Sequence, residues 1–543
     1  MRRVGHGAEF RVAENQSVRD VSGRLRRDFA ALGAANEEWG PGMKTLGTIL
    51  LGSVAGLVLI GAAQAADLPT KKTPIAPPPA NCYASFMTWL DSTATDCPLS
   101  YMGVTVYGAI DMGAGYETAA TPFNRDFPNG VQELISKTSN GAKWQAVPNG
   151  ISQSNIGVKI KEQIVPNWFI VGDADFGFDP YSFQMANGPK SLVDNNFYPS
   201  TRQDLISANG DSSRAGQWDN TRAFLGVSNT TLGTLTFGRQ YSFTNDISAA
   251  YDPFGGAYAF SLIGTSGTVE AGTGETETAR YDTSFKYQVA YNGFRAAAIA
   301  QVGGWEQGNG AEAAYQVDLG ADYAGFSVDA VYAYDKDAVK LGAYGGVPAS
   351  PLAPDTLKAT LADVNAGVIG VKYKWQALTL YGGYEYAQLS SPSDLTAAGS
   401  AYGIPAGNVY TLNGGYPAVI QTNAFVNPED LQVLWIGAKY GLLSNLDAAV
   451  GYYHEWQNTY DIAPATNCVA NTTAAAPGAT PQGTKKSDCA GTTDAVSAML
   501  DWRPVKRVDV YGGVMFSQVA GGMANGFIHD ENTAFTGGVR LSF

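Results

Sequence analysis

The stretch DVNAGVIGVKYKWQALTLYGGYEYA, residues 363–387, consists of two runs joined by the dipeptide Gln376-Ala377. Apolar positions in the first run alternate with small or basic ones: Ile369, Val371, Tyr373 and Trp375 against Gly370, Lys372 and Lys374. An alternation of period two predicts a β-strand with one apolar face and one wetter face. A connection of only two residues predicts that the two runs pair as an antiparallel hairpin.

The same pattern recurs from Gly103 to the C-terminus. Seven hairpins, with one strand before them and one after, give sixteen predicted strands. The predicted strands are residues 103–116, 155–164, 168–178, 222–228, 234–241, 280–290, 294–302, 314–323, 326–335, 363–375, 378–387, 431–440, 446–457, 494–502, 508–517 and 534–543. Long segments rich in Gly, Pro and Asn lie between the hairpins, for example 179–221, 242–279, 388–430 and 458–493. An even strand number, with short turns at one end and long loops at the other, is typical of outer-membrane barrels. The sequence therefore predicts an all-β, 16-stranded antiparallel transmembrane β-barrel with short periplasmic turns and long extracellular loops.

The composition agrees with a barrel and disfavours other classes. Charged residues make up 15% of the chain, whereas soluble domains carry about 25%. The mean hydropathy is nevertheless only −0.11, which excludes a bundle of transmembrane helices. Aromatic residues, at 11%, are too frequent for a disordered chain. Loops of this length are rare in compact soluble domains. Aromatic residues recur beside the short turns, as expected of an interfacial girdle: Trp168, Tyr323, Trp375, Tyr440 and Trp502.

The N-terminal region predicts export. An apolar run, Thr45–Ala65, follows Met43-Lys44 and ends in an A-x-A triplet, which indicates a secretory signal peptide. The alternative is a single membrane-anchoring helix. We expect residues 1–42 to be an upstream extension from an early start codon, the alternative being a long functional n-region. Residues 43–65 would then be the signal peptide, 66–102 a Pro-rich periplasmic leader, and 103–543 the barrel.

The cysteines and the net charge restrict the chemistry further. Four cysteines lie after the signal, and an even number in an exported protein favours disulfides. Three pairings are possible; Cys82 with Cys97 and Cys468 with Cys489 are preferred because each closes a short loop. The formal net charge of −14 argues against nucleic acid as a partner. No CxxC occurs and the three histidines are scattered, so we expect neither a metal nor a cofactor.

Several stretches resemble a known family, the general porins of Gram-negative outer membranes, especially the alphaproteobacterial type. They are VTVYGAIDMG (104–113), SNIGVKIKEQI (154–164), GDSSRAGQWDN (210–220), LTFGRQYS (235–242) and AYDPFGGAYAFS (250–261). The resemblance covers about residues 103–543. The C-terminal Phe543, after alternating apolar residues, resembles the signal read by the outer-membrane assembly machinery. The resemblance implies a trimeric, water-filled pore in the bacterial outer membrane that passes small hydrophilic solutes.

The resemblance also implies that the third long loop folds inward and narrows the pore. This loop, about Ser242–Ala279, contains no Lys or Arg but five acidic residues: Asp246, Asp252, Glu270, Glu275 and Glu277. A basic patch on the wall should face this loop. Strand parity, meaning that every second residue of a strand faces the same side, suggests five residues for it: Lys159, Lys161, Arg222, Arg280 and Lys286. Opposed charges create a transverse field, and uncompensated carboxylates predict a weak cation preference.

Two wall residues test the parity argument. The resemblance implies, through the FGRQ context, that Arg239 lies in the constriction, yet strict alternation places it on the lipid side with Leu235 and Phe237. Either the strand ends, a bulge occurs at Gly238, or the assignment fails. In residues 280–290, alternation places Tyr281 on the apolar face and Arg280 on the polar one.

Other functions are less well supported by the residues. An enzyme is not expected, because no GxSxG or GxxxxGK[ST] motif occurs and HEW at 454–456 lacks a second His. Asp173 and Asp175 share parity and should face the lumen, where they would tune the pore. The remaining alternatives are a substrate-selective channel and a barrel-based surface adhesin or receptor that binds through its long loops.

Overall fold

The computed structural model describes residues 82–119, 135, 141–181, 219–264, 280–302, 313–338, 362–390, 409–412, 416–419, 427–460, 468, 485, 489–524 and 527–543. All of them belong to one compact unit, residues 77–543. The predicted upstream extension and signal peptide lie outside the described residues. Within the described part, no helix is long and apolar enough to cross a membrane.

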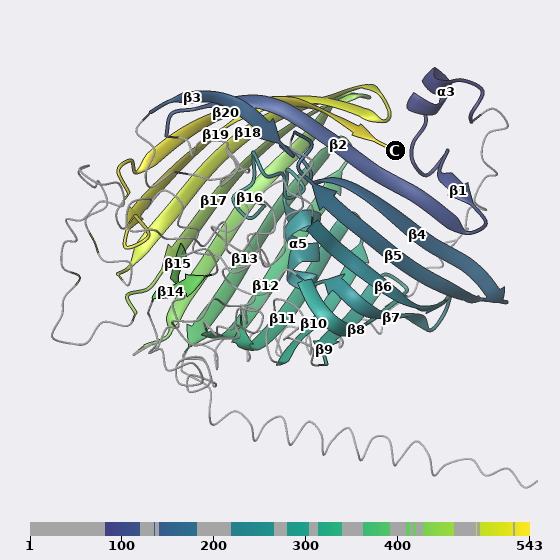
Figure 1. Ribbon diagram of the computed structural model, residues 1–543, viewed down its shortest axis with the longest axis horizontal. Helices are drawn as coiled ribbons and strands as arrows, with labels where there is room; N and C mark the ends of the chain where they lie inside the picture. Colours follow the sequence, from purple (N-terminus) through teal and green to yellow (C-terminus); the bar gives the residue numbers. More distant parts are fainter. Residues whose placement is uncertain are drawn as a thin grey trace, which may run out of the picture. The chain divides into compact units, whose positions relative to one another are not determined.

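Sixteen strands form a closed ring in which every strand is antiparallel to both neighbours (Figure 1). In ring order they are β2 (Val104–Glu117), β4 (Ser154–Val165), β5 (Trp168–Phe178), β6 (Asp219–Asn229), β7 (Gly233–Tyr241), β8 (Arg280–Tyr291), β9 (Phe294–Gln301), β10 (Ala313–Tyr323), β11 (Phe326–Ala338), β12 (Ala362–Trp375), β13 (Leu378–Ser390), β16 (Glu429–Leu443), β17 (Leu446–Gln457), β18 (Gly491–Val505), β19 (Val508–Gly521) and β20 (Glu531–Ser542). The ring closes where β20 pairs with β2, with Ser542 opposite Ala109. The prediction of a 16-stranded antiparallel barrel is confirmed.

The short turns have the backbone geometry that tight hairpins need. Between β8 and β9, Asn292 and Gly293 have φ values of 49° and 85°. Two successive positive φ angles define a type I′ turn, whose twist matches that of paired strands. The sequence Asn-Gly is the preferred pair for this turn, so the local sequence determines the hairpin register.

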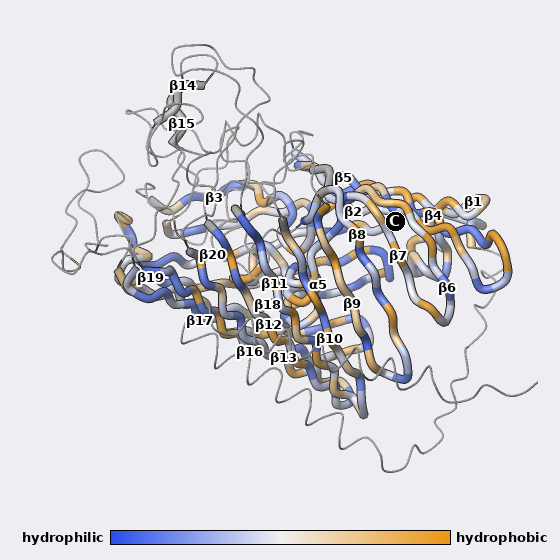
Figure 2. The backbone as a smooth tube through the Cα atoms, turned by 90° about the horizontal axis from the view of Figure 1, so that it is seen from below, coloured by the Kyte–Doolittle hydropathy of each residue, from blue (hydrophilic) through white to orange (hydrophobic). Residues whose placement is uncertain are grey.

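Apolar and polar residues alternate along the strands, as the coloured tube of Figure 2 shows. On β12, Ile369, Val371 and Trp375 are exposed on the outside of the ring. The intervening Lys372 lies inside, where its Nζ donates to the carbonyl of Ala250 at 3.3 Å. The predicted face assignment of this strand is confirmed.

Two short strands that were not predicted lie alongside β2, one near each of its ends. β1 (Leu99–Tyr101) and β3 (Lys143–Pro148) both pair with β2. Between β3 and β4 the chain turns around the carboxylate of Asp111, which accepts hydrogen bonds from the amides of Ile151 (2.8 Å) and Ser152 (2.9 Å). A further pair, β14 (Val409–Leu412) and β15 (Tyr416–Val419), forms a separate two-stranded sheet.

The cysteines pair locally. Cys82 is bonded to Cys97 and Cys468 to Cys489, so the preferred pairing of the four cysteines is confirmed. The first disulfide closes a loop that contains helix α3 (Phe86–Leu90).

One strand departs from the predicted parity. Gly238 of β7 pairs with Ser284 of β8, but Gln240 pairs with Tyr281, so β8 contains one extra residue near Thr283, whose φ is 46°. This bulge reverses the alternation. Tyr281, predicted on the lipid face, is instead fully buried, and its hydroxyl donates to Asp335. That part of the prediction was wrong.

Candidate channel constriction

The loop after β7 begins with helix α5 (Phe243–Tyr251), which is tied to the inner wall. Ser242 caps the helix, its hydroxyl accepting from the amide of Asn245 at 3.2 Å. The free amides of Phe243 and Thr244 donate to Oε1 of Gln316 on β10, at 2.7 and 3.2 Å. These amides have no partner within a helix, so the glutamine both satisfies them and positions the helix.

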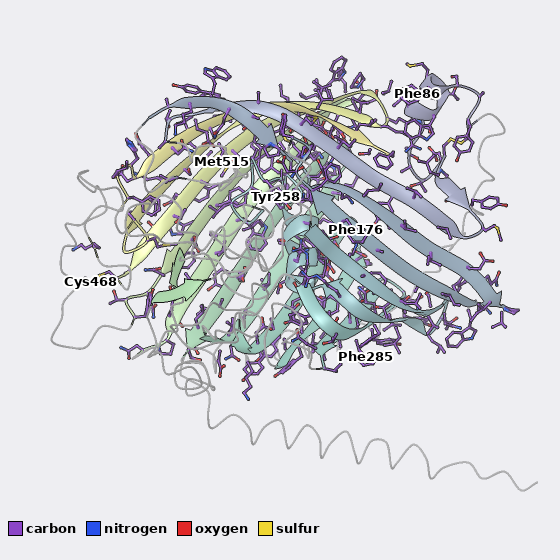
Figure 3. The ribbon with its side chains drawn as sticks, viewed as in Figure 1. Phe86, Phe176, Tyr258, Phe285, Cys468 and Met515 are labelled. Carbon is purple, nitrogen blue, oxygen red and sulfur yellow. A yellow bond between two sulfur atoms is a disulfide. The ribbon has the colours of Figure 1, made fainter. Side chains whose placement is uncertain are left out.

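Beyond the helix, the loop contacts successive strands around the interior. The Tyr251 hydroxyl donates to Oδ2 of Asp329 on β11 at 2.6 Å, and the indole nitrogen of Trp435 on β16 donates to the Tyr251 carbonyl at 3.0 Å. The amide of Ala259 donates to the carbonyl of Gly150, beside β2, at 2.9 Å. Figure 3 shows Tyr258 amid the side chains that the strands enclose. The predicted inward folding of the third long loop is confirmed for residues 242–264.

Apolar side chains of the loop and of the inner wall form one hydrophobic core. The loop contributes Phe243, Ile247, Tyr251, Phe254, Phe260, Leu262 and Ile263, and the wall contributes Val331, Val368, Val433, Trp435, Met499 and Met515. Burial of one such side chain contributes about 1.5–3 kcal/mol. The inward face of β11–β19 is therefore partly apolar where the loop covers it, whereas a wet face was expected.

Glycines on the wall allow the loop to lie close to the strands. A Cβ atom on Gly370 would stand 2.5 Å from Cγ of Tyr251, and one on Gly437 would stand 2.5 Å from Cγ of Pro253. Real Cβ atoms do not approach other atoms so closely. A larger residue at either position would push the loop away from the wall.

The two described loop acids have specific partners. Asp246 pairs with Lys286 of β8, Oδ2 to Nζ 2.9 Å. Asp252 is only 2% exposed and accepts hydrogen bonds from the amides of Phe254 and Gly256 and from the Tyr453 hydroxyl of β17. Burial raises the pKa of the Asp252 carboxyl to about 6. Asp252 thus attaches the loop to the wall, while Glu270, Glu275 and Glu277 lie outside the described residues.

The predicted basic wall is partly compensated by neighbouring acids. Arg222 of β6 pairs with Asp175 at 3.0 Å and with Asp173 at 3.6 Å. Its guanidinium also donates to the Tyr107 hydroxyl at 3.0 Å, and Nζ of Lys159 lies 4.2 Å from the centre of the same ring. The structure brings Lys159 and Arg222 together with the two aspartates that were expected to face the lumen.

The other predicted wall residues are less closely grouped. Nζ of Lys161 lies 5.4 Å from the ring centre of Phe169. Arg280 is 4% exposed and its guanidinium lies 5.4 Å from the ring centre of Tyr241, although the bulge on β8 removes the parity argument that placed it. Arg239 is partly exposed and lies opposite Ala223, at the register shift between Gly238 and Gln240. Its place in the constriction stays a prediction.

Other charged residues of the inner wall were not among the predicted site residues. Arg295 of β9 pairs with Asp329 (3.0 Å) and Asp322, next to the Tyr251 contact of the loop. Two more groups of ion pairs lie on the strands from β16 to β20. One joins Lys439, Asp447, Arg503 and Asp501, and the other joins Asp509 and Arg540. Parity alone could have placed these residues inward, but their pairing depends on the register between strands.

Phe543 forms the last rung of the closing pair. Its amide donates to the Gly108 carbonyl at 2.9 Å and its carbonyl accepts from the Gly108 amide at 3.0 Å. The assembly signal at Phe543 stays a prediction. Among the described residues, no three or more His, Cys, Asp or Glu side chains are grouped so as to hold a metal ion.

A closed ring of sixteen antiparallel strands, with an apolar outer face and an inward loop, defines the class of transmembrane β-barrel channels. Residues 54–521 match the family described as Gram-negative porin, and the chain belongs to this family. The protein is therefore an outer-membrane porin.

Individual relatives are more distant. The chain is 27% identical over 194 residues to an outer membrane porin protein of Bordetella pertussis, covering 35% of this chain and 40% of that protein. Among solved structures, OmpT of Vibrio cholerae is 14% identical with a TM-score of 0.46, over 82% of this chain and 99% of that one. An anion-selective porin from Comamonas acidovorans is 14% identical with a TM-score of 0.47, over 81% of this chain and 99% of that one.

Proposed function

We propose that the barrel passes ions and small hydrophilic solutes by passive diffusion, with a weak preference for cations. The observation that carries the proposal is the loop 242–264, which is fixed along the inner wall from β10 to β19. Charged side chains project from β4, β5 and β6 on another sector of the ring. Charged groups that face water in a narrow passage bias the flow of ions through it. Porins are typically channels rather than enzymes, and we expect no catalytic activity.

The charge balance of the interior supports the direction of the preference. The sequence of the loop after β7, residues 242–279, contains five acidic residues and no Lys or Arg. Ion pairs neutralise part of this charge, as between Asp246 and Lys286. The surplus of negative charge is therefore smaller than the count, which is why we propose a weak preference.

The selectivity is tested by removing loop carboxylates. The double variant Glu275→Gln with Glu277→Gln should shift the reversal potential in a salt gradient toward that of an anion-preferring pore. The matched control is Asp91→Asn with Asp96→Asn, which removes two exposed carboxylates from the leader rather than from the loop. An unchanged reversal potential in the double variant would remove these two residues from the constriction.

We also propose a homotrimer and an exported mature chain that begins after Ala65. The sequence resemblance supports the trimer, and the A-x-A triplet supports the cleavage site. Native mass spectrometry of the protein from outer membranes should give three copies, and N-terminal sequencing should begin at Ala66. A monomer, or a retained apolar segment, would contradict the respective proposal.

A further inference from the structure

Residues 82–101, here called the leader knob, consist of a loop closed by the Cys82–Cys97 disulfide and of β1, and they lie at the short-turn end of β2 (Figure 1). Within it, β1 pairs with β2, with Leu99 opposite Val106 and Tyr101 opposite Val104. β20 pairs along the same β2 strand from Ala109 onward. The leader knob therefore extends the barrel sheet next to the seam where the first and last strands of the ring meet.

A buried arginine fixes the orientation of the leader knob. Arg507, in the short turn between β18 and β19, is 2% exposed. Its guanidinium donates to the carbonyls of Trp89 (2.9 Å), Thr93 (3.0 Å) and Cys97 (2.7 Å) and lies 4.3 Å from the centre of the Trp89 ring. Hydrogen bonds from a charged group to three carbonyls hold the leader knob to the barrel in one arrangement.

The paired strand continues the outward face of β2. Residues directly opposite each other in an antiparallel pair point to the same side of the sheet. Val104 and Val106 are exposed and belong to the outward apolar series of β2. Leu99 and Tyr101 therefore share their face, and Tyr101 is 79% exposed.

Helix α3 of the leader knob also carries exposed apolar side chains. Phe86 is 66% exposed and Met87 is 62% exposed. The centre of the Phe86 ring, labelled in Figure 3, lies 5.6 Å from that of Trp89 in a stacked arrangement, so the helix presents an aromatic pair rather than an isolated side chain. Several exposed apolar residues gathered in one short segment indicate an interaction surface. Aromatic residues in particular accumulate at the boundary between lipid headgroups and acyl chains.

We propose that the leader knob is a membrane-interface anchor whose exposed side chains, Tyr83, Phe86, Met87, Leu99 and Tyr101, contact phospholipid in the periplasmic leaflet. Continuity of β1 with the outward face of β2 argues for lipid as the occupant. The short turns mark the periplasmic end of the barrel. No Lys or Arg occurs in residues 82–102, which fits a contact made by apolar and aromatic side chains rather than by headgroup charge.

Photo-crosslinking in the native membrane tests the proposal. Phe86 is replaced by p-benzoylphenylalanine in the full chain, and only protein that still opens channels in a bilayer is analysed. Leu225→p-benzoylphenylalanine, on the outside of β6 and 58% exposed, gives the yield expected of a lipid contact. Thr95→p-benzoylphenylalanine, an exposed polar position in the same disulfide loop, is the matched control. Irradiated protein is digested, and mass spectrometry of the peptides detects attached phospholipid.

We expect a phospholipid adduct at position 86 comparable to that at position 225 and severalfold above that at position 95. A crosslink to a second copy of the chain would overturn the proposal and make the leader knob a subunit contact. A crosslink within the same chain, or no adduct at position 86, would also overturn it. None of these outcomes depends on ion selectivity, so the proposal can fail while the channel function stands.

Discussion

At the residue scale, Asp252 joins the loop to the wall through a carboxyl whose pKa burial raises to about 6. The unfolded carboxyl titrates near 3.8. Below about pH 4 the Asp252 carboxyl is protonated in both the folded and the unfolded state. Between about pH 4 and 6 it is protonated only in the folded state. Stability of the loop attachment therefore falls as the pH rises through this window and stays lower above it. The difference amounts to about 3 kcal/mol at most.

Hydrogen exchange of residues 243–264, corrected for the intrinsic effect of pH, measures this dependence. Protection should be up to about 100-fold higher at pH 4 than at pH 7. Asp252→Asn cannot titrate, so its corrected protection should not change between these pH values. A native loop with the same protection at both values would contradict the role assigned to Asp252.

Gly370 gives a second prediction at this scale. Gly370→Ala places a methyl group 2.5 Å from Cγ of Tyr251, so the loop must move away from the wall. Such overpacking costs about 1–3 kcal/mol. We expect a changed single-channel conductance with more open-state noise. Gly382→Ala is the control, because its nearest atom would be 3.5 Å away. Identical recordings from the two variants would show that the loop does not depend on this contact.

Single residues also show where parity is sufficient. Alternation correctly brought Asp173, Asp175 and Arg222 to one inner surface, because β5 and β6 stay in register from Asp173 to Asp175 and the register shifts only after Asp175. It failed at Tyr281, because the extra residue near Thr283 is visible only in the register between β7 and β8. A bulge changes which side a residue faces without changing the local composition, so the sequence contains no clear signal of it.

At the element scale, Arg507 holds the leader knob to the turn between β18 and β19. Arg507→Ala removes hydrogen bonds from a charged donor, each contributing about 1.5–3 kcal/mol. Chymotrypsin should then cleave at Tyr83, Phe86 or Trp89 at least about tenfold faster, while the barrel stays folded. Lys506→Ala, at an exposed position in the same turn, should leave the rate unchanged. Equal rates for the two variants would contradict the anchoring role of Arg507.

Elements differ in how far the sequence predicts them. All sixteen strands of the ring were predicted, because a period of two persists through each strand and a short turn joins each hairpin. The path of α5 was not predicted, because it depends on Gln316, Trp435 and the wall glycines, which are distant in sequence. β1 and β3 are too short to show periodicity, and they are defined by their pairing with β2.

At the scale of the whole molecule, closure of the ring gives every strand in it a hydrogen-bonded neighbour on both sides. A sheet in lipid requires this, because unpaired backbone N–H and C=O groups find no water there. The inward loop then occupies part of the interior and adds an apolar core between itself and the wall. Low overall charge follows from this arrangement, because the outer face contacts lipid and part of the inner face is covered.

Single-channel recording of the refolded mature chain in a planar bilayer, with neutral solutes of graded size, tests the central claim most directly. A water-filled channel narrowed by the loop after β7 should give large, stable current steps. Solutes small enough to enter should lower the conductance, and those above a defined size should not. Folded protein that inserts without current steps, or a current that one solute saturates at low concentration, would contradict a general diffusion channel.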